Sequence, residues 1–340
     1  MKKINWGIIG LGSVAKVFAE GFDSTKNATL LGVASRSNDK VKIFKEKYQI
    51  KNNFCFDHYQ DLIEQNQIDI IYLALPTLFH KEWIIKCLKN NKHVLVEKPA
   101  VMNLGEIFEV KKNLNNKTNF FEAFMYLFQP QIIKTIELIQ SNEIGELISM
   151  KTYFGNNLLT KKNWFGLVKK KKINPNKRIF NKRLGGGAIL DLGCYPVSFS
   201  TKIASLFGNI NLNNVSLLNK KLTLGPTEVD VDSYVDLKFD NGFISKIGAS
   251  FSNNLGRSSE IIGTQGKIIL EDTWTANPSK IILKKKNKDK IFKFKKNDNI
   301  YSYEIDELSK IILNPSIQNN LVTKIDETII NTKIIDSWKN

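Results

Sequence analysis

The sequence predicts an α/β protein in which a doubly wound parallel sheet is followed by an α+β domain with an open, largely antiparallel sheet. In the first third, short apolar runs alternate with amphipathic segments, whereas from residue 147 onward strand-like runs follow one another with short turns. Parallel sheets covered on both faces need near-continuous apolar strands, and short turns need antiparallel pairing. A length of 340 residues fits two domains.

The first domain is expected to end near Glu122, which divides the chain into residues 1–122 and 123–340. Its predicted strands are residues 4–9, 30–34, 68–75, 93–96 and 120–125. The intervals between them are predicted to be helical, including residues 104–114, and Pro130 opens a further helix over 130–142.

The second domain is predicted from four strands and two closing helices. The strands are residues 147–154, 228–239, 243–251 and 267–270, and Asp240-Asn241-Gly242 is a hairpin signal. The helices cover 302–313 and 325–338, and the last of them can pack back on the first domain. The polar segment 156–183 is too long for an ordinary connection and is expected to be an active-site loop.

Composition excludes several classes of protein. No apolar run approaches the roughly 20 residues that cross a bilayer, and residues 4–9 are a first strand rather than a signal peptide. The three cysteines are widely spaced without a C-x-x-C pair, which argues against a disulfide framework and against a structural zinc site. We therefore expect a cytoplasmic protein without a metal.

The net charge of +17 comes from 50 basic and 33 acidic residues and raises nucleic acid, an anionic membrane surface or a small anion as partners. The lysine tracts 169–172 and 284–286 lie in polar connecting stretches, as on a solvated surface. No nucleic-acid-binding motif accompanies the charge, so we expect neither a nucleic-acid nor a membrane partner.

A nucleotide-binding signal follows the first predicted strand. The residues Gly10-Leu11-Gly12-Ser13-Val14-Ala15 match G-x-G-x-x-G/A and open a helix, the setting that this fingerprint requires. Gly10 permits a tight turn, Gly12 lets a pyrophosphate approach the backbone, and Ala15 lets helix and strand pack closely. Free N–H groups at the helix start, including those of Ser13 and Val14, would bind the anion. The alternative is a glycine turn without a ligand.

The end of the second strand favours NADP over NAD. NAD-preferring sites usually carry a carboxylate there, whereas this chain has Ser35-Arg36-Ser37. A guanidinium and hydroxyls suit a 2′-phosphate that a carboxylate would repel. Alternatively, Arg36 stacks on adenine and permits either cofactor.

Candidate catalytic groups come from both domains. Glu97-Lys98-Pro99 follows the strand 93–96 at the carboxyl edge of the sheet, where doubly wound folds bind ligands. Asp191 and Tyr195 are i and i+4 on a helix predicted to be opened by glycines, so both would project from one face. A lysine ammonium near the phenol would favour its ionised form. The alternatives are a surface turn at Lys98 and a core position for Tyr195.

Together these motifs resemble the Gfo/Idh/MocA oxidoreductase family. The resemblance covers residues from about 3 to the C-terminal helix and is carried by the glycine fingerprint, by Y-L-A-L-P-T-L-F-H at 72–80, by E-K-P at 97–99, by E-A-F-M at 122–125 and by G-G-G-A-I-L-D-L-G-C-Y-P at 185–196. D-x-x-x-Y at 191–195 is similar to the branch of glucose-fructose oxidoreductase, xylose dehydrogenase and dimeric dihydrodiol dehydrogenase.

The resemblance implies an NAD(P)-dependent enzyme that moves a hydride between nicotinamide C4 and a carbinol or carbonyl carbon of a sugar, polyol or related diol. Lys98 and Tyr195 would share the substrate hydroxyl as the acid/base pair, and Asp191 would orient the substrate or the tyrosine. The family places nicotinamide-ribose contacts at Pro76, Thr77 and His80, although a histidine at a helix start can equally be structural. Glu97 would brace the Lys98 loop.

Arg178 resembles a loop arginine of the family that meets substrate or cofactor oxygen atoms, and its alternative role is one more cation in a basic loop. Leu127 and Gln129 stand where the branch often has an arginine and a histidine, so the substrate of a relative does not transfer. We expect a homodimer or homotetramer, as in relatives. The competing functions are a non-catalytic dinucleotide-binding sensor or regulator and, from charge alone, a nucleic-acid binder.

Overall fold

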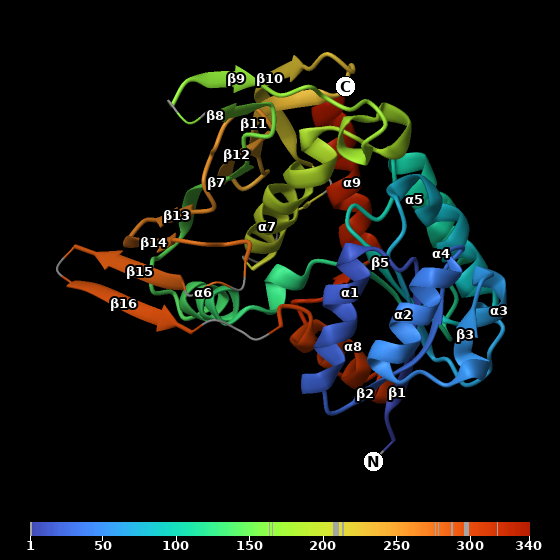
Figure 1. Cartoon of the computed structure of the whole chain (residues 1–340). Helices are drawn as coiled ribbons and strands as arrows, with labels where there is room; N and C mark the ends of the chain where they lie inside the picture. The colour runs from blue at the N-terminus through green and yellow to red at the C-terminus, as the bar shows by residue number, and fades with distance from the viewer. Residues whose placement is uncertain are drawn as a thin grey trace. The chain divides into compact units, whose positions relative to one another are not determined.

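The first part of the chain folds around a parallel sheet, as the sequence predicts (Figure 1). The computed structural model describes residues 2–162, 164, 166–206, 211–212, 214–275, 277, 279–286, 288–295, 299–317 and 319–340. The chain divides into two units, Met1–Gln129 with Asp298–Ile329 and Pro130–Asn297 with Ile330–Asn340.

Five strands of the first unit lie at the predicted apolar runs, whereas the sequence does not predict the short strands Cys55–Phe56 and Thr323–Lys324. Their order is β17-β6-β5-β4-β1-β2-β3, and only β17 runs antiparallel to its neighbour. The order reverses between β1 and β4, the switch point at which doubly wound sheets bind ligands. The bounds are β1 Ile4–Ile9, β2 Ala28–Ala34, β3 Cys55–Phe56, β4 Ile70–Leu73, β5 His93–Glu97, β6 Phe120–Ala123 and β17 Thr323–Lys324.

Helices accompany these strands as the alternating pattern predicts. The core between them is apolar: Ile71, Leu88, Val94 and Val96 are each fully buried. The helices of this unit are α1 Ser13–Glu20, α2 Asn38–Tyr48, α3 Tyr59–Ile63, α4 His80–Lys89, α5 Leu104–Asn113 and α8 Ser302–Leu313, with the first residues of α9 Ile325–Lys339.

The C-terminal part of the chain completes the first unit. Lys324 in β17 pairs with Phe121 in β6, and the indole of Trp6 donates a 2.9 Å hydrogen bond to Ser309 in α8. The unit therefore differs from the expected segment 1–122, because it extends to Gln129 and takes in Asp298–Ile329. The reason is long-range pairing: Trp6 and Ser309 are 303 positions apart, and local patterning does not register such contacts.

The second unit is built on a sheet in the order β10-β11-β12-β7-β13-β14-β15-β16. Its pairs are antiparallel except β12 with β7, so the predicted open, largely antiparallel sheet is confirmed. Gly242 has φ of +88°, and the predicted hairpin joins β11 to β12. The strands are β7 Leu147–Gly155, β10 Ser216–Leu224, β11 Asp230–Lys238, β12 Ile244–Ser250, β13 Ser259–Gly263, β14 Gly266–Leu270, β15 Ser279–Lys285 and β16 Lys288–Phe294.

Helices and a small hairpin accompany this sheet. The helices of the described residues here are α6 Pro130–Gln140, α7 Cys194–Ser205 and the part of α9 from Ile330 onward, and α7 packs on β7 and β12. The segment 156–183, expected to be a loop, contains the paired strands β8 Thr160–Lys162 and β9 Val168–Lys170, while residues 163 and 165 lie outside the described residues. Its last part forms 3-10 turns at Arg178–Phe180 and at Lys182–Leu184.

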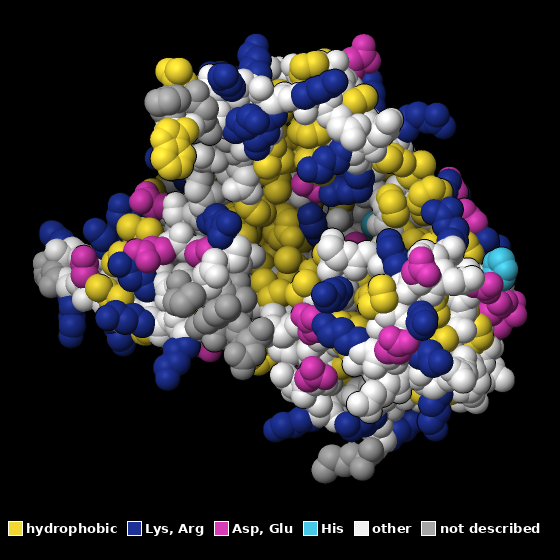
Figure 2. All heavy atoms as spheres, in the orientation of Figure 1, with side chains coloured by type: hydrophobic (Ala, Val, Ile, Leu, Met, Phe, Trp, Pro, Cys, Tyr) yellow, Lys and Arg dark blue, Asp and Glu magenta, His cyan; other side chains and the backbone are white. Residues whose placement is uncertain are grey.

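The surface carries the basic excess in dispersed form. On the face that Figure 2 shows, Lys and Arg side chains are spread out and interspersed with Asp and Glu. Among the described residues, no helix is both long and apolar enough to cross a membrane. All three cysteines are free thiols.

Candidate functional site

The glycine fingerprint forms an open turn at the carboxyl end of β1. Gly10 has φ of +89°, and a Cβ atom there would lie 2.6 Å from the carbonyl oxygen of Ala74. Position 10 therefore requires glycine for two reasons, the positive φ and the close approach of the backbone that follows β4.

Gly12 presents a different situation, because a Cβ atom there would meet nothing within 4 Å. It precedes α1, whose start has no side-chain cap, and Ser13 and Val14 are exposed. Ala15 is fully buried and packs the helix onto the sheet. The helix start thus offers uncapped N–H groups and open space to an anionic ligand, which fits a dinucleotide pyrophosphate.

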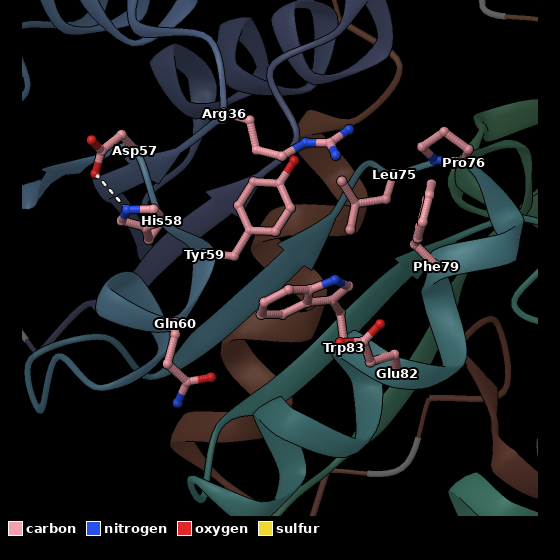
Figure 3. A pocket seen from close by; sticks show the side chains of 10 residues that line it. All are labelled: Arg36, Asp57, His58, Tyr59, Gln60, Leu75, Pro76, Phe79, Glu82 and Trp83. Atoms are coloured by element: carbon pink, nitrogen blue, oxygen red, sulfur yellow. Dashed lines mark ion pairs between the residues drawn. The ribbon is translucent and has the colours of Figure 1, made fainter.

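Arg36 lies at the end of β2 and lines a pocket of about 350 Å³. In Figure 3 its guanidinium lies between the hydroxyl of Tyr59 and the side chain of Leu75. Ser35 is buried, and its hydroxyl oxygen accepts a 3.2 Å hydrogen bond from the backbone N–H of Ser37. The other lining residues are Asp57, His58, Gln60, Pro76, Phe79, Glu82 and Trp83.

Two aromatic residues give this pocket an apolar wall. The rings of Tyr59 and Trp83 meet edge to face with centroids 4.9 Å apart. The ammonium of Lys86 lies 4.1 Å from the centre of the Trp83 ring. Sequence reasoning did not single out Tyr59 or Trp83, since their contact joins residues 24 positions apart on two different helices, α3 and α4. A flat apolar wall beside a guanidinium suits an adenine base and its ribose phosphate.

His80 is 1% exposed and contacts backbone on two loops. Its Nδ1 lies 3.1 Å from the carbonyl oxygen of Pro99 and 3.2 Å from that of Ala100. Its Nε2 lies 2.7 Å from the carbonyl oxygen of Leu75. The histidine therefore ties the loop after β4, which carries Pro76 and Thr77, to the turn that carries Lys98. Thr77 is itself buried.

Glu97 ends β5 at the same edge of the sheet, Lys98 follows it directly, and both are half-buried. The hydroxyl of Tyr72 in β4 donates a hydrogen bond to Glu97 Oε1. Tyr72 is fully buried and stacks on Phe18. Burial and, second, the charge of Glu97 hold the pKa of Tyr72 well above its usual range. Glu97 thus braces the turn that carries Lys98.

A second carboxyl group supports this turn from β6. Glu122 is 5% exposed; it accepts a 2.9 Å hydrogen bond from the N–H of Ala100 and another of 2.9 Å from the hydroxyl of Thr328 in α9. Burial raises the pKa of Glu122 to about 7. Sequence reasoning noted Glu122 only within E-A-F-M, because nothing local shows that its side chain meets the turn after β5.

In the second unit, Asp191 lies in a π-helical turn, Ile189–Gly193, that leads directly into α7. The sequence predicts that Asp191 and Tyr195 lie four positions apart on one regular α-helix. This prediction is wrong for Asp191, which lies in the π-helical turn. A π turn inserts an extra residue and rotates the side chains relative to an α-helix. Such turns depend on packing and leave no periodic signal in the sequence.

Arg178 and Asp191 are brought together by this turn. The guanidinium of Arg178 forms an ion pair with Asp191 Oδ1, and the Asp191 side chain is 15% exposed. The glycine segment holds the two in place, since the N–H of Gly187 donates a 3.0 Å hydrogen bond to the carbonyl of Ile179. The carboxylate is thereby oriented and its charge balanced.

Tyr195 lies in the first turn of α7 and is 5% exposed. Its ring packs edge to face against Phe154, with centroids 5.4 Å apart, and against Trp274 at 5.8 Å. The ring direction is therefore fixed by two aromatic neighbours. Lys98 belongs to the first unit and Tyr195 to the second, and their meeting stays a prediction. Among the described residues, no cluster of three His, Cys, Asp or Glu side chains suits a metal ion.

Comparisons with known proteins assign both parts of the chain. The family model for the oxidoreductase family with an NAD-binding Rossmann fold matches residues 4–123. The model for the GFO/IDH/MocA C-terminal domain matches residues 132–269. The predicted family and fold class are thereby confirmed.

Curated relatives are similar at modest identity. A trans-1,2-dihydrobenzene-1,2-diol dehydrogenase from Xenopus tropicalis is 27% identical over 83% of this chain and 79% of its own length. A dTDP-3,4-didehydro-2,6-dideoxy-alpha-D-glucose 3-reductase from Saccharopolyspora spinosa is 27% identical over 81% of this chain and 76% of its own.

Solved structures share the fold over nearly the whole chain. An aldose-aldose oxidoreductase from Caulobacter crescentus, complexed with glycerol, has a TM-score of 0.85 at 18% identity and covers 99% of this chain and 96% of its own. A 3-ketoreductase from Actinomadura kijaniata with NADP and TDP-benzene has a TM-score of 0.81 at 19% identity, covering 99% and 97%.

Proposed function

Because the chain belongs to the Gfo/Idh/MocA family of oxidoreductases, we propose that it interconverts a secondary alcohol and a carbonyl group on a sugar, polyol or related diol with NADP as cofactor. The single observation that carries this proposal is the carboxyl edge of the first sheet. The open turn at Gly12, the pocket at Arg36 and the braced turn at Lys98 all lie along that edge.

Different residues along this edge bind different parts of the dinucleotide. The uncapped start of α1 at Gly12, Ser13 and Val14 holds the pyrophosphate, which the positive helix end attracts. Arg36 and Ser35 hold the 2′-phosphate, and the wall of Tyr59 and Trp83 takes the adenine. The preference for NADP rests on Arg36, and the Actinomadura kijaniata structure with NADP supports it.

When bound, the nicotinamide accepts or supplies the hydride at its C4. Lys98 and Tyr195 bind the reacting oxygen of the substrate. In oxidation the hydroxyl proton passes from that oxygen to the pair, and in reduction the pair returns a proton to the same oxygen.

Asp191 and Arg178 are expected to act on the substrate together with Tyr195. The ion pair fixes the Asp191 carboxylate, and its second oxygen can accept a hydrogen bond from a substrate hydroxyl. A diol or sugar presents two neighbouring hydroxyls, one for the acid/base pair and one for Asp191. Relatives named as a diol dehydrogenase and a deoxyglucose 3-reductase support this substrate class.

The test has two stages. Fluorescence titration with NADPH and NADH measures cofactor binding, and a panel of aldoses, polyols and cyclic diols with NADP at 340 nm measures turnover. Lys98→Met and Tyr195→Phe should each abolish turnover, and Tyr195→Phe should spare NADPH binding, while Tyr303→Phe at an exposed position serves as the control. NADPH binding without turnover on any substrate would favour a dinucleotide sensor. Absence of NADPH binding would contradict both the oxidoreductase and the sensor function.

A further inference from the structure

Asp230, the first residue of β11, meets the start of the helical segment that carries Asp191 and Tyr195. Its Oδ2 accepts a 2.6 Å hydrogen bond from the N–H of Ile189. The N–H of Ala188 also acts on this carboxylate, because it lowers the pKa of Asp230. The side chain is 7% exposed, so these bonds are shielded from water.

The glycines before this helix leave room for Asp230 and remove the usual cap. A Cβ atom at Gly187, where φ is +115°, would overlap Asp230 Oδ1. Neither Gly187 nor Ala188 has a side chain that can accept a hydrogen bond from the helix start. The first N–H groups of a helix need such an acceptor when they are buried. A carboxylate from a strand 41 positions away supplies it.

We propose that Asp230 is a positioning residue that fixes the start of the π-helical turn and, through it, the directions of Asp191 and Tyr195. Asp191 lies two positions after the N–H that Asp230 holds, so a shift of the helix start moves its carboxylate directly. A carboxylate at this end also matches the positive helix dipole. The inference rests on the proposed function, because only that reaction gives the two side chains a task.

Burial opposes a charge at this place. Burial raises the pKa of Asp230, and the N–H groups of Ile189 and Ala188 act in the opposite direction. The carboxylate of Asp230 thus lies where burial disfavours its ionised form. An uncharged amide side chain at this position could also accept a hydrogen bond. A hydrogen bond to a charged carboxylate is about twice as strong as one to a neutral acceptor. This additional strength holds the start of the helical segment in place.

The experiment compares Asp230→Ala and Asp230→Asn with a matched control, Asp236→Asn. Asp236 lies on the same strand and accepts a 2.9 Å hydrogen bond from Asn219 at the surface. Hydrogen exchange of the Ala188 and Ile189 amides, followed by NMR, reports the helix start without any substrate. NADPH titration reports the first unit, and turnover is measured with the substrate found in the screen.

In Asp230→Ala we expect the Ile189 amide to exchange at least about fivefold faster, as the loss of a helix cap implies. We expect kcat to fall about tenfold or more and NADPH affinity to stay within about twofold. The amide exchange rate and kcat of Asp230→Asn should lie between those of Asp230→Ala and the unaltered protein. Asp236→Asn should match the unaltered protein in both measurements. If Asp230→Ala does not fold, the Asn variant carries the test.

A double-mutant comparison separates positioning from general destabilisation. In an Asp191→Asn background, Asp230→Ala should reduce the remaining turnover less than in the unaltered protein, because the carboxylate that Asp230 positions is already gone. Equal reductions in both backgrounds, or amide exchange at the unaltered rate in both Asp230 variants, would overturn the proposal. Failure to bind NADPH would contradict the proposed function alone, since amide exchange tests the positioning by itself.

Discussion

Glu122 accepts a hydrogen bond of 2.9 Å from the backbone N–H of Ala100, two residues after Lys98. Its other carboxylate oxygen binds the hydroxyl of Thr328, so the turn after β5 is joined to α9 through one buried side chain. His80 holds the same turn through the carbonyls of Pro99 and Ala100. The backbone around Lys98 is therefore fixed on both its donor and its acceptor groups.

This arrangement predicts a pH dependence of stability. Burial raises the pKa of Glu122 from 4.5 to about 7, so the folded chain binds this proton more tightly than the unfolded chain. The free energy of unfolding should therefore fall as pH rises from about 4.5 to about 7, by about 3 kcal/mol for a shift of this size. Glu122→Gln should remove this fall, as thermal unfolding at pH 5, 6, 7 and 8 will show. Exposed Glu46→Gln is the control, and an unchanged slope in Glu122→Gln would contradict the prediction.

Gly12 predicts a separation of binding from folding. A side chain there meets no neighbour, and its φ of −87° suits any residue. Gly12→Val should therefore leave the melting temperature within about 2 °C, since surface substitutions change stability little. NADPH binding should be lost, because the added methyl groups occupy the space of the pyrophosphate. Fluorescence titration checks this, and retained NADPH affinity would show that the dinucleotide does not approach Gly12.

Arg36 predicts the choice between the two dinucleotides. Arg36→Ala should weaken NADPH binding about 10- to 100-fold, the range for a lost hydrogen-bonded charge pair, and should change NADH binding little. Lys40→Ala, an exposed cation in α2, is the control. If Arg36 stacks on adenine instead, affinity for both dinucleotides will fall together in the paired titrations.

The ion pair of Arg178 and Asp191 predicts coupled effects on turnover. Arg178→Ala and Asp191→Asn should each lower kcat by about tenfold or more with NADPH affinity unchanged, because each disturbs one oriented carboxylate. The double variant should lose little beyond the larger single effect. Arg183→Ala at an exposed neighbouring position controls for loss of positive charge. If instead the fold-loss of kcat in the double variant equals the product of the two single fold-losses, the two residues serve different steps.

The sequence by itself determined the elements whose signals are local. β1 and α8 have the predicted bounds, and Gly10 and Gly242 stand where a turn requires a positive φ, because backbone conformation and apolar periodicity are set within a few residues. The fingerprint, the position of Lys98 at a strand end and the family could be read in the same way.

Only the tertiary structure decided which side chains support the site. The π-helical turn at Asp191 and the hydrogen bonds that Ile189 N–H donates to Asp230 and Ala100 N–H donates to Glu122 have no periodic signature. The same holds for β17, which joins β6 from the far end of the chain. Each depends on segments distant in sequence packing together, and the free energy of such contacts appears only when the whole core has formed.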